Sequence, residues 1–125
     1  MTIKLVNLYI QEGNMCRKVL IVDDDYSFIC NLVNSQPDCG MSFSIADSLN
    51  RANDMLNRDN FDLIIANSKI PGGSSLSLKN KIPSDTEILF LSSLDSEYNK
   101  IKDSGEKCYH KYNLGNRFEV LFSNV

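Results

Sequence analysis

Short apolar runs rich in β-branched residues alternate with helical patterns along most of this chain. Residues 19–22 read Val-Leu-Ile-Val and residues 63–66 read Leu-Ile-Ile-Ala, without a polar residue that would face solvent. A strand that is apolar on both faces needs helices on both faces of its sheet, and such sheets are parallel. The alternation therefore predicts an α/β fold in three layers, with a parallel sheet in the middle.

Five strand patterns are present, and a helical pattern follows each of them. We expect strands over residues 18–23, 41–46, 62–67, 87–92 and 107–111. We expect helices over 26–34, after a cap at Asp47 or Ser48, through Leu76 and Leu78, over 95–104, and over 114–122 after a cap at Asn113. These elements predict a doubly wound, five-stranded, flavodoxin-like α/β/α fold with strand order 2-1-3-4-5, in which ligands bind beyond the carboxyl ends of the strands.

Length and charge narrow the class of protein further. The 125 residues suffice for one domain with one core, which we place over 17–125. The net charge of -3 and the lack of a basic cluster argue against direct nucleic-acid binding. No apolar run approaches the roughly 20 residues that span a bilayer, so we expect no membrane partner and a cytoplasmic protein. Residues 1–16 are expected to be a disordered or accessory extension, and Met15 is an alternative start.

The cysteines and the single histidine do not form a metal-binding pattern. No two cysteines have Cys-x-x-Cys spacing, and one histidine cannot complete a Cys/His zinc set. We expect free thiols, with Cys30 and Cys108 as small apolar fillers and His110 as a filler at the end of its strand.

Polar residues collect where the predicted strands end. Asp23 and Asp24 follow the first strand, and Asn67 ends the third. Ser92 ends the fourth strand and Lys111 ends the fifth. Because the carboxyl ends of parallel strands meet at one edge of a sheet, we expect these side chains to lie close together.

This arrangement resembles the receiver domain of response regulators in two-component signalling, over about residues 17–122. In that family two acids after the first strand hold Mg²⁺, and an aspartate at the end of the third strand accepts a phosphoryl group. A serine or threonine and a lysine at the ends of the last two strands contact that group. Pro71 lies four residues after Asn67, as in the family's Asp-x-x-x-Pro, and Lys69 falls where the family offers a backbone carbonyl to the metal.

Asn67 departs from the family pattern, because an amide stands at the phosphoacceptor position. A carboxylate oxygen can attack phosphorus and bind Mg²⁺, whereas a neutral amide does both far less well. The resemblance therefore implies a degenerate phosphoacceptor position at Asn67, an acidic pocket of Asp23 and Asp24, and switch positions at Ser92 and Lys111. We expect no resident cofactor, and weak residual Mg²⁺ binding by Asp23 and Asp24 stays open.

Some of these positions also have a purely structural interpretation. The Ser92 hydroxyl can bond the nearby backbone at the strand end. Lys111 can pair with Asp23 or Asp24 instead of meeting a phosphate, and Tyr112 follows it where the family has proline.

The leading hypothesis is a pseudo-receiver, a phosphorylation-independent module for signalling or transcription regulation that is not an enzyme. The resemblance implies protein partners, or a homodimer, at the face formed by the fourth helix, fifth strand and last helix. Two alternatives stay open. Residues 23–27 also fit the Asp-x-Asp-x-Ser/Thr opening of haloacid-dehalogenase-like, Mg²⁺-dependent phosphatases. A receiver phosphorylated at a non-standard residue, Ser68 or Ser92, is the other.

Overall fold

Five strands form one parallel sheet in the order β2-β1-β3-β6-β7, which confirms the predicted strand order. The strands are β1 (Arg17–Val22), β2 (Met41–Ala46), β3 (Leu63–Asn67), β6 (Glu87–Ser92) and β7 (Cys108–His110). The computed structural model describes residues 17–36, 40–115 and 117–122, so the predicted extension over residues 1–16 lies outside it.

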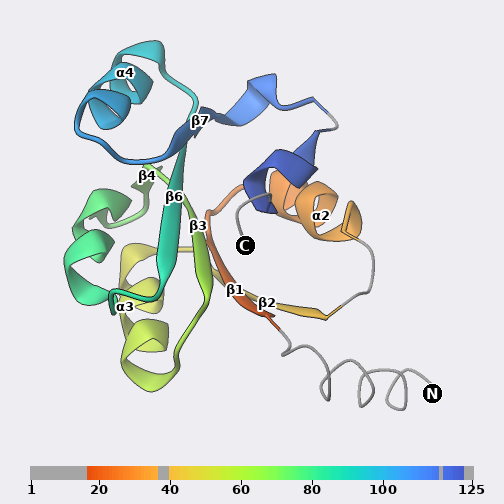
Figure 1. The fold of residues 1–125 in the computed structure, drawn as a ribbon, viewed down its shortest axis with the longest axis vertical. Helices are drawn as coiled ribbons and strands as arrows, with labels where there is room; N and C mark the ends of the chain where they lie inside the picture. The colour runs from red at the N-terminus through yellow and green to blue at the C-terminus, as the bar shows by residue number, and fades with distance from the viewer. Residues whose placement is uncertain (1–16, 37–39, 116, 123–125) are drawn as a thin grey trace.

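Helical segments cover both faces of the sheet, giving three layers (Figure 1). One face carries α2 (Tyr26–Asn34) and the 3₁₀ segment η3 (Phe118–Phe122), and the other carries α3 (Leu49–Arg58), the 3₁₀ segment η1 (Ser75–Lys81) and α4 (Asp95–Asp103). In the described part of the chain, no helix is long and apolar enough to cross a bilayer.

Strand residues alternate between two apolar cores. Val19 and Ile21 of β1 belong to the core under α2, whereas Leu20 and Val22 belong to the core under α3 and α4. Each of these four side chains is at most 1% exposed. Both faces of the central strands are therefore dry, which explains why their sequences show no polar alternation.

Side-chain caps fix where the first two helices begin. Asp25 Oδ1 accepts a hydrogen bond from the Phe28 N–H at 3.2 Å, and Ser48 Oγ accepts one from the Arg51 N–H at 3.2 Å. Each oxygen satisfies a backbone donor that has no partner within its helix. Ser48 is one of the two caps predicted for α3, and Asp25 is the cap of α2.

The predicted last helix over 114–122 is wrong. Within the described residues of that range only the 3₁₀ segment η3 is helical, and Asn113 ends a separate 3₁₀ segment, η2 (Lys111–Asn113), instead of capping an α-helix. Gly115 lies between them with φ of +61°, a backbone conformation that ends a right-handed helix. The apolar stripe of the prediction is nevertheless buried in the core, at Leu114, Phe118, Leu121 and Phe122.

Of the three residues expected to be fillers, Cys30 and His110 have other surroundings. Cys30 is exposed on α2, whereas Cys108 is buried, and burial raises the pKa of the Cys108 thiol to about 11. His110 stacks on Tyr98 with ring centroids 3.8 Å apart, and its Nδ1 lies 3.6 Å from Asp95 Oδ1. His110 therefore joins β7 to α4, with an acid partner that the sequence did not suggest.

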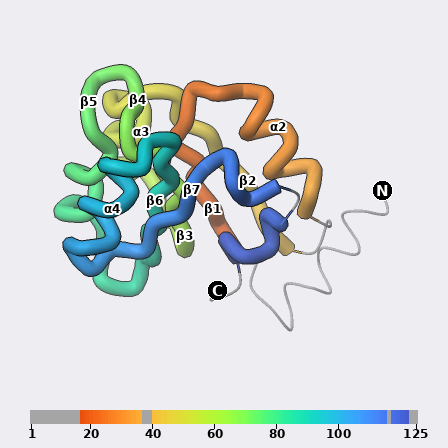
Figure 2. The backbone as a smooth tube through the Cα atoms, turned by 90° about the horizontal axis from the view of Figure 1, so that it is seen from above, coloured from red at the N-terminus to blue at the C-terminus, as the bar shows by residue number. Residues whose placement is uncertain are grey.

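A short hairpin follows β3 and packs against α3 (Figure 2). It consists of β4 (Lys69–Ile70) and β5 (Gly73–Ser74), which pair antiparallel around the predicted turn. The Leu49 N–H at the start of α3 donates to the Pro71 carbonyl at 2.9 Å. Gly72 has φ of +101°, and a Cβ atom there would lie 3.1 Å from Leu49 Cβ.

Gly72→Ala should therefore destabilise the protein more than Gly105→Ala. Both glycines have positive φ, which costs a residue with a side chain about 1–2 kcal/mol. A Cβ atom at Gly105 meets nothing within 4 Å, whereas one at Gly72 adds the contact with Leu49, at about 1 kcal/mol or more. Urea unfolding of the two variants measures the difference, and equal losses would show that the hairpin moves away from α3 without cost.

Candidate functional site

The predicted site residues lie at one end of the sheet, where the carboxyl ends of the strands meet. The parallel register pairs Val22 of β1 with Ala66 of β3. The next residues along the two strands, Asp23 and Asn67, therefore lie at the same level. Ser92 ends β6 on the next strand, and Lys111 follows β7 directly. The fold therefore gathers the ends of these four strands at one end of the sheet.

A buried ion pair lies at the centre of this end. Lys111 Nζ is 2.8 Å from Asp23 Oδ2, and the two side chains are 3% and 1% exposed. The ammonium also lies 3.4 Å from Asp25 Oδ2 and 4.8 Å from the centroid of the Phe28 ring. Each buried charge loses several kcal/mol of hydration, so each depends on the other. This is the pairing that the sequence left open as an alternative to a phosphate contact.

The second acid beside Lys111 is Asp25, not the predicted Asp24. Asp24 is exposed, whereas Asp25 Oδ2 accepts a hydrogen bond from the Tyr112 hydroxyl at 2.6 Å. The other oxygen of Asp25 caps α2 through Phe28, so one carboxylate orients both the helix and Tyr112. We call Lys111, Asp23, Asp25 and Tyr112 the lysine cluster. The sequence signal that could have found Asp25 is its place directly before the helical stripe, where a cap is expected.

Burial and hydrogen bonds move the pKa values of the lysine cluster in different directions. Burial raises the pKa of Asp23, against the opposing hydrogen bond and charge of Lys111. Burial alone would lower the pKa of Lys111, but the hydrogen bond and charge of Asp23 outweigh it, and the pKa is raised overall. The Tyr112 hydroxyl lowers the pKa of Asp25. Lys111 therefore stays charged at neutral pH and acts as a built-in cation.

The Asn67 side chain is satisfied within its own loop. Its Nδ2–H donates to the backbone carbonyl of Lys69 at 2.9 Å, and its own backbone carbonyl accepts from the Ser75 hydroxyl at 2.7 Å. In the receiver resemblance, the Lys69 carbonyl is the backbone oxygen that would bind the metal. A carboxylate at position 67 has no hydrogen to donate, so this bond exists only because the residue is an amide.

Two buried serines at this end of the sheet also have hydrogen-bond partners for their hydroxyls. Ser92 is fully buried; its hydroxyl donates to the Leu94 carbonyl at 3.1 Å and accepts from the Leu94 N–H at 3.2 Å. Ser68 is 2% exposed, and its hydroxyl donates to Glu97 in the first turn of α4. Glu97 Oε2 also faces Lys69 Nζ at 3.8 Å. The Ser92 hydroxyl thus bonds the backbone beside the strand end, and the Ser68 hydroxyl links the end of β3 to α4.

The side chains at this end do not fit a bound Mg²⁺ ion as they stand. Within residues 17–36, 40–115 and 117–122, no group of three or more His, Cys, Asp and Glu side chains could hold a metal ion. Asp23 faces Lys111, and the Lys69 carbonyl accepts from Asn67, which leaves Asp24 as an exposed carboxylate. Mg²⁺ requires a near-octahedral set of oxygens. Forming one here would break the ion pair or the amide bond, so the predicted residual site of Asp23 and Asp24 is not assembled.

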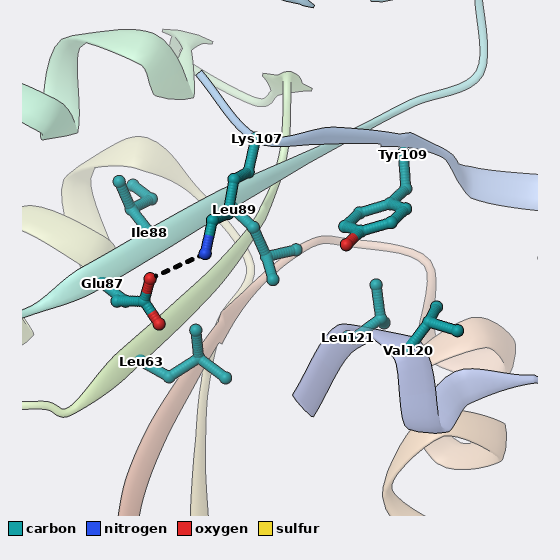
Figure 3. A pocket seen from close by; sticks show the side chains of 8 residues that line it. All are labelled: Leu63, Glu87, Ile88, Leu89, Lys107, Tyr109, Val120 and Leu121. Atoms are coloured by element: carbon teal, nitrogen blue, oxygen red, sulfur yellow. Dashed lines mark hydrogen bonds and ion pairs between the residues drawn. The ribbon is translucent and has the colours of Figure 1, made fainter. Parts of the chain in front are cut away.

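A hollow at the opposite end of the strands does not compete as a ligand site (Figure 3). It offers about 10 Å³ of free space, which is room for about one water molecule. The Glu87–Lys107 ion pair, at 2.9 Å, lies along one side of it. Its lining is mostly apolar: Leu63, Glu87, Ile88, Leu89, Lys107, Tyr109, Val120 and Leu121.

Lys111→Met should lower the free energy of unfolding by about 3–5 kcal/mol at neutral pH, because it leaves Asp23 buried without its partner. The double variant Asp23→Asn/Lys111→Met should recover part of this loss, since the uncompensated charge is gone. Lys100→Met removes an exposed lysine of α4 and is the matched control, with an expected change within about 0.5 kcal/mol. Urea unfolding measures all three variants.

The difference in the free energy of unfolding between wild type and Lys111→Met should also depend on pH. The pKa of Lys111 is raised above its ordinary value of 10.5, so its stabilising contribution is fully present below pH 10.5. The contribution is lost as the pH rises through the raised value, and the gap between wild type and Lys111→Met should narrow there. A Lys111→Met variant as stable as the Lys100→Met control at neutral pH would contradict the role given to the ion pair.

Asn67→Asp should cost about 1–3 kcal/mol without Mg²⁺, because the donor to Lys69 is lost and a second carboxylate stands level with Asp23. Added Mg²⁺ should restore part of this loss by binding only the folded variant. Asn99→Asp makes the same charge change on an exposed position of α4 and should move stability by at most about 0.5 kcal/mol. Equal melting temperatures for wild type and Asn67→Asp, with and without Mg²⁺, would refute this prediction.

Comparison of this structure with solved structures agrees with the fold described above. No protein-family model and no curated protein matches the chain. The non-phosphorylated HemR receiver domain from Leptospira biflexa is similar in structure, with 19% identity and a TM-score of 0.71 over 86% of this chain and 92% of that chain. The receiver domain of the Francisella response regulator 1452 has 27% identity and a TM-score of 0.63, over 86% and 98%. The response regulator TrrA from Thermotoga maritima, solved in complex with Mg²⁺-BeF, has 20% identity and a TM-score of 0.69, over 87% and 99%. The chain therefore has the fold of response-regulator receiver domains.

Proposed function

We propose that this chain is an atypical response-regulator receiver domain, a pseudo-receiver that works in signalling as a protein-interaction module without being phosphorylated. The observation that carries the proposal is the amide at Asn67, at the phosphoacceptor position of the fold. Its hydrogen bond to the Lys69 carbonyl is one that an aspartate could not make.

The charges around this position support the same conclusion. A phosphorylated receiver needs a nucleophilic carboxylate and a cation free to meet the phosphoryl oxygens. Here the nucleophile is replaced by a neutral amide, and the Lys111 ammonium lies 2.8 Å from Asp23 and 3.4 Å from Asp25. The absent nucleophile and the already paired cation both support the proposal.

Regulation by partner binding requires a surface whose contacts a partner can change. We assign this role to the face formed by α4 and β7, with the 3₁₀ segment η3 in place of a last helix. α4 is fastened to β3 through Ser68 and Glu97, and to β7 through the stack of Tyr98 on His110. A partner that engages this face would bias these few contacts, and the proposal places this interaction in the cytoplasm.

The two other hypotheses have less support. Phosphorylation of Ser68 or Ser92 would require hydroxyls that reach a donor, but both serines are buried and hydrogen-bonded. A haloacid-dehalogenase-like phosphatase would use Asp23 as its nucleophile, but Asp23 is 1% exposed and paired with Lys111. We therefore propose neither activity.

Incubation with acetyl phosphate and Mg²⁺ should leave the intact mass of the wild-type chain unchanged, because no carboxylate stands at the acceptor position. Intact-mass spectrometry after short and long incubation measures this directly. A stable phosphoryl adduct on the wild-type chain would overturn the proposal.

Asn67→Asp is the informative companion in this assay, and Asn99→Asp is its matched control. Labelling of Asn67→Asp alone would show that the amide by itself silences the reaction. No labelling of either variant would show that the Lys111–Asp23 pair blocks it as well.

A further inference from the structure

The two edges of the sheet differ in their protection against another strand. β7 has only three residues, and the exposed Lys107 directly precedes it. β2 has six residues, Met-Ser-Phe-Ser-Ile-Ala, without a charge or a proline. Within the described residues, β2 pairs on one side only, with β1 (Figure 1). Edge strands are usually blunted by short length, lysine or proline, so β7 is protected and β2 is not.

Backbone groups of alternate β2 residues point toward the open side. The Gly40 and Ala46 carbonyls accept from the N–H groups of Arg17 and Asp23, at 2.7 and 3.0 Å, so they point toward β1. Because this direction alternates along a strand, the even-numbered residues between them also face β1. The N–H and C=O groups that face away from β1 belong to Met41, Phe43 and Ile45.

The side chains beside the open edge are only partly covered. Met41 and Phe43 pack at the border of the core under α2, and Phe43 meets Phe122 edge to face with ring centroids 6.3 Å apart. Ile45 is 39% exposed. A second strand on this edge would therefore gain apolar contact as well as backbone hydrogen bonds.

The β2 sequence is self-complementary when two copies run in opposite directions. In an antiparallel pairing centred on Phe43, Met41 faces Ile45 of the second copy, Ser42 faces Ser44, and Phe43 faces its own copy. Apolar side chains meet apolar ones, hydroxyls meet hydroxyls, and no charges are opposed. The same register makes the three outward-facing residues the hydrogen-bonded pairs of an antiparallel ladder. Among the antiparallel registers that match apolar with apolar residues, this one pairs all three outward-facing residues, and it fits a second copy of this strand.

We propose that two copies of this chain associate through their β2 edges, as an antiparallel pair around a two-fold axis. The sheet then continues from one copy into the other, and the α4–β7 face stays free at the opposite edge of each copy. This inference names a partner for the proposed interaction module, but it rests on β2 alone. The phosphodonor assay therefore cannot decide it, and a failure of one proposal is distinguishable from a failure of the other.

Sedimentation of the full chain, from about 1 µM to about 1 mM, should show a reversible monomer–dimer equilibrium. Ile45→Pro removes an N–H that points away from β1, so it spares the monomer's own ladder and should weaken dimerisation at least about tenfold. Ile45→Val is the matched control and should dimerise like the wild type. If Ile45→Pro does not fold, as judged by circular dichroism, Ile45→Lys takes its place and should weaken the dimer similarly.

The register itself is tested by mixing Ser42→Cys with Ser44→Cys under oxidising conditions. Directly opposite residues in this register come within disulfide range, so a 42–44 crosslink should appear only in the mixture, located by peptide mass spectrometry. A chain that stays monomeric over the whole concentration range would overturn the proposal. A dimer unaffected by Ile45→Pro and Ile45→Lys would overturn it as well, as would protection of the amides of residues 41, 43 and 45 from hydrogen exchange in a monomeric sample.

Discussion

The ion pair between Lys111 and Asp23 is the interaction on which the candidate site depends. It joins the residue after β7 to the residue after β1, two strands that are not neighbours in the sheet. Because both groups are buried, neither charge is stable there alone, and the pair ties the ends of the sheet together. Asp25 and Tyr112 extend the pair to the start of α2. The end of the sheet where a receiver would bind metal and phosphate therefore already contains its own cation.

The amide at Asn67 complements this arrangement. It donates to the Lys69 carbonyl, an oxygen that the receiver resemblance would give to the metal. The ammonium of Lys111 lies against Asp23 Oδ2 and the amide of Asn67 donates to the Lys69 carbonyl, so both oxygens already face a group that would compete with a bound cation. These contacts hold the end of the sheet together without metal, and under the proposed function the chain acts through its surfaces. The open β2 edge and the α4–β7 face lie at opposite sides of the sheet and can act independently.

The central strands β1, β3 and β6 could be predicted from the sequence because their short apolar runs have no polar face, as strands buried on both sides require. The last helix could not, because its four apolar residues reach the core equally well when the positive φ of Gly115 interrupts the helical path. Three consecutive aspartates are chemically equal in sequence. Which of them faces Lys111 depends on where α2 begins. The place of Asp25 before the helical stripe marks it as a cap, but its contact with Lys111 appears only in the fold.

Nuclear magnetic resonance of the Lys111 ammonium and the Asn67 side-chain amide, during titration with Mg²⁺, tests the central claim most directly. The account predicts a slowly exchanging ammonium signal, because Lys111 is buried against Asp23, and no change in either signal at millimolar Mg²⁺. Saturable shifts of both signals with added Mg²⁺ would show that the cation enters and displaces these groups. That result would contradict the view that Lys111 and Asn67 keep Mg²⁺ from the oxygens at this end of the sheet.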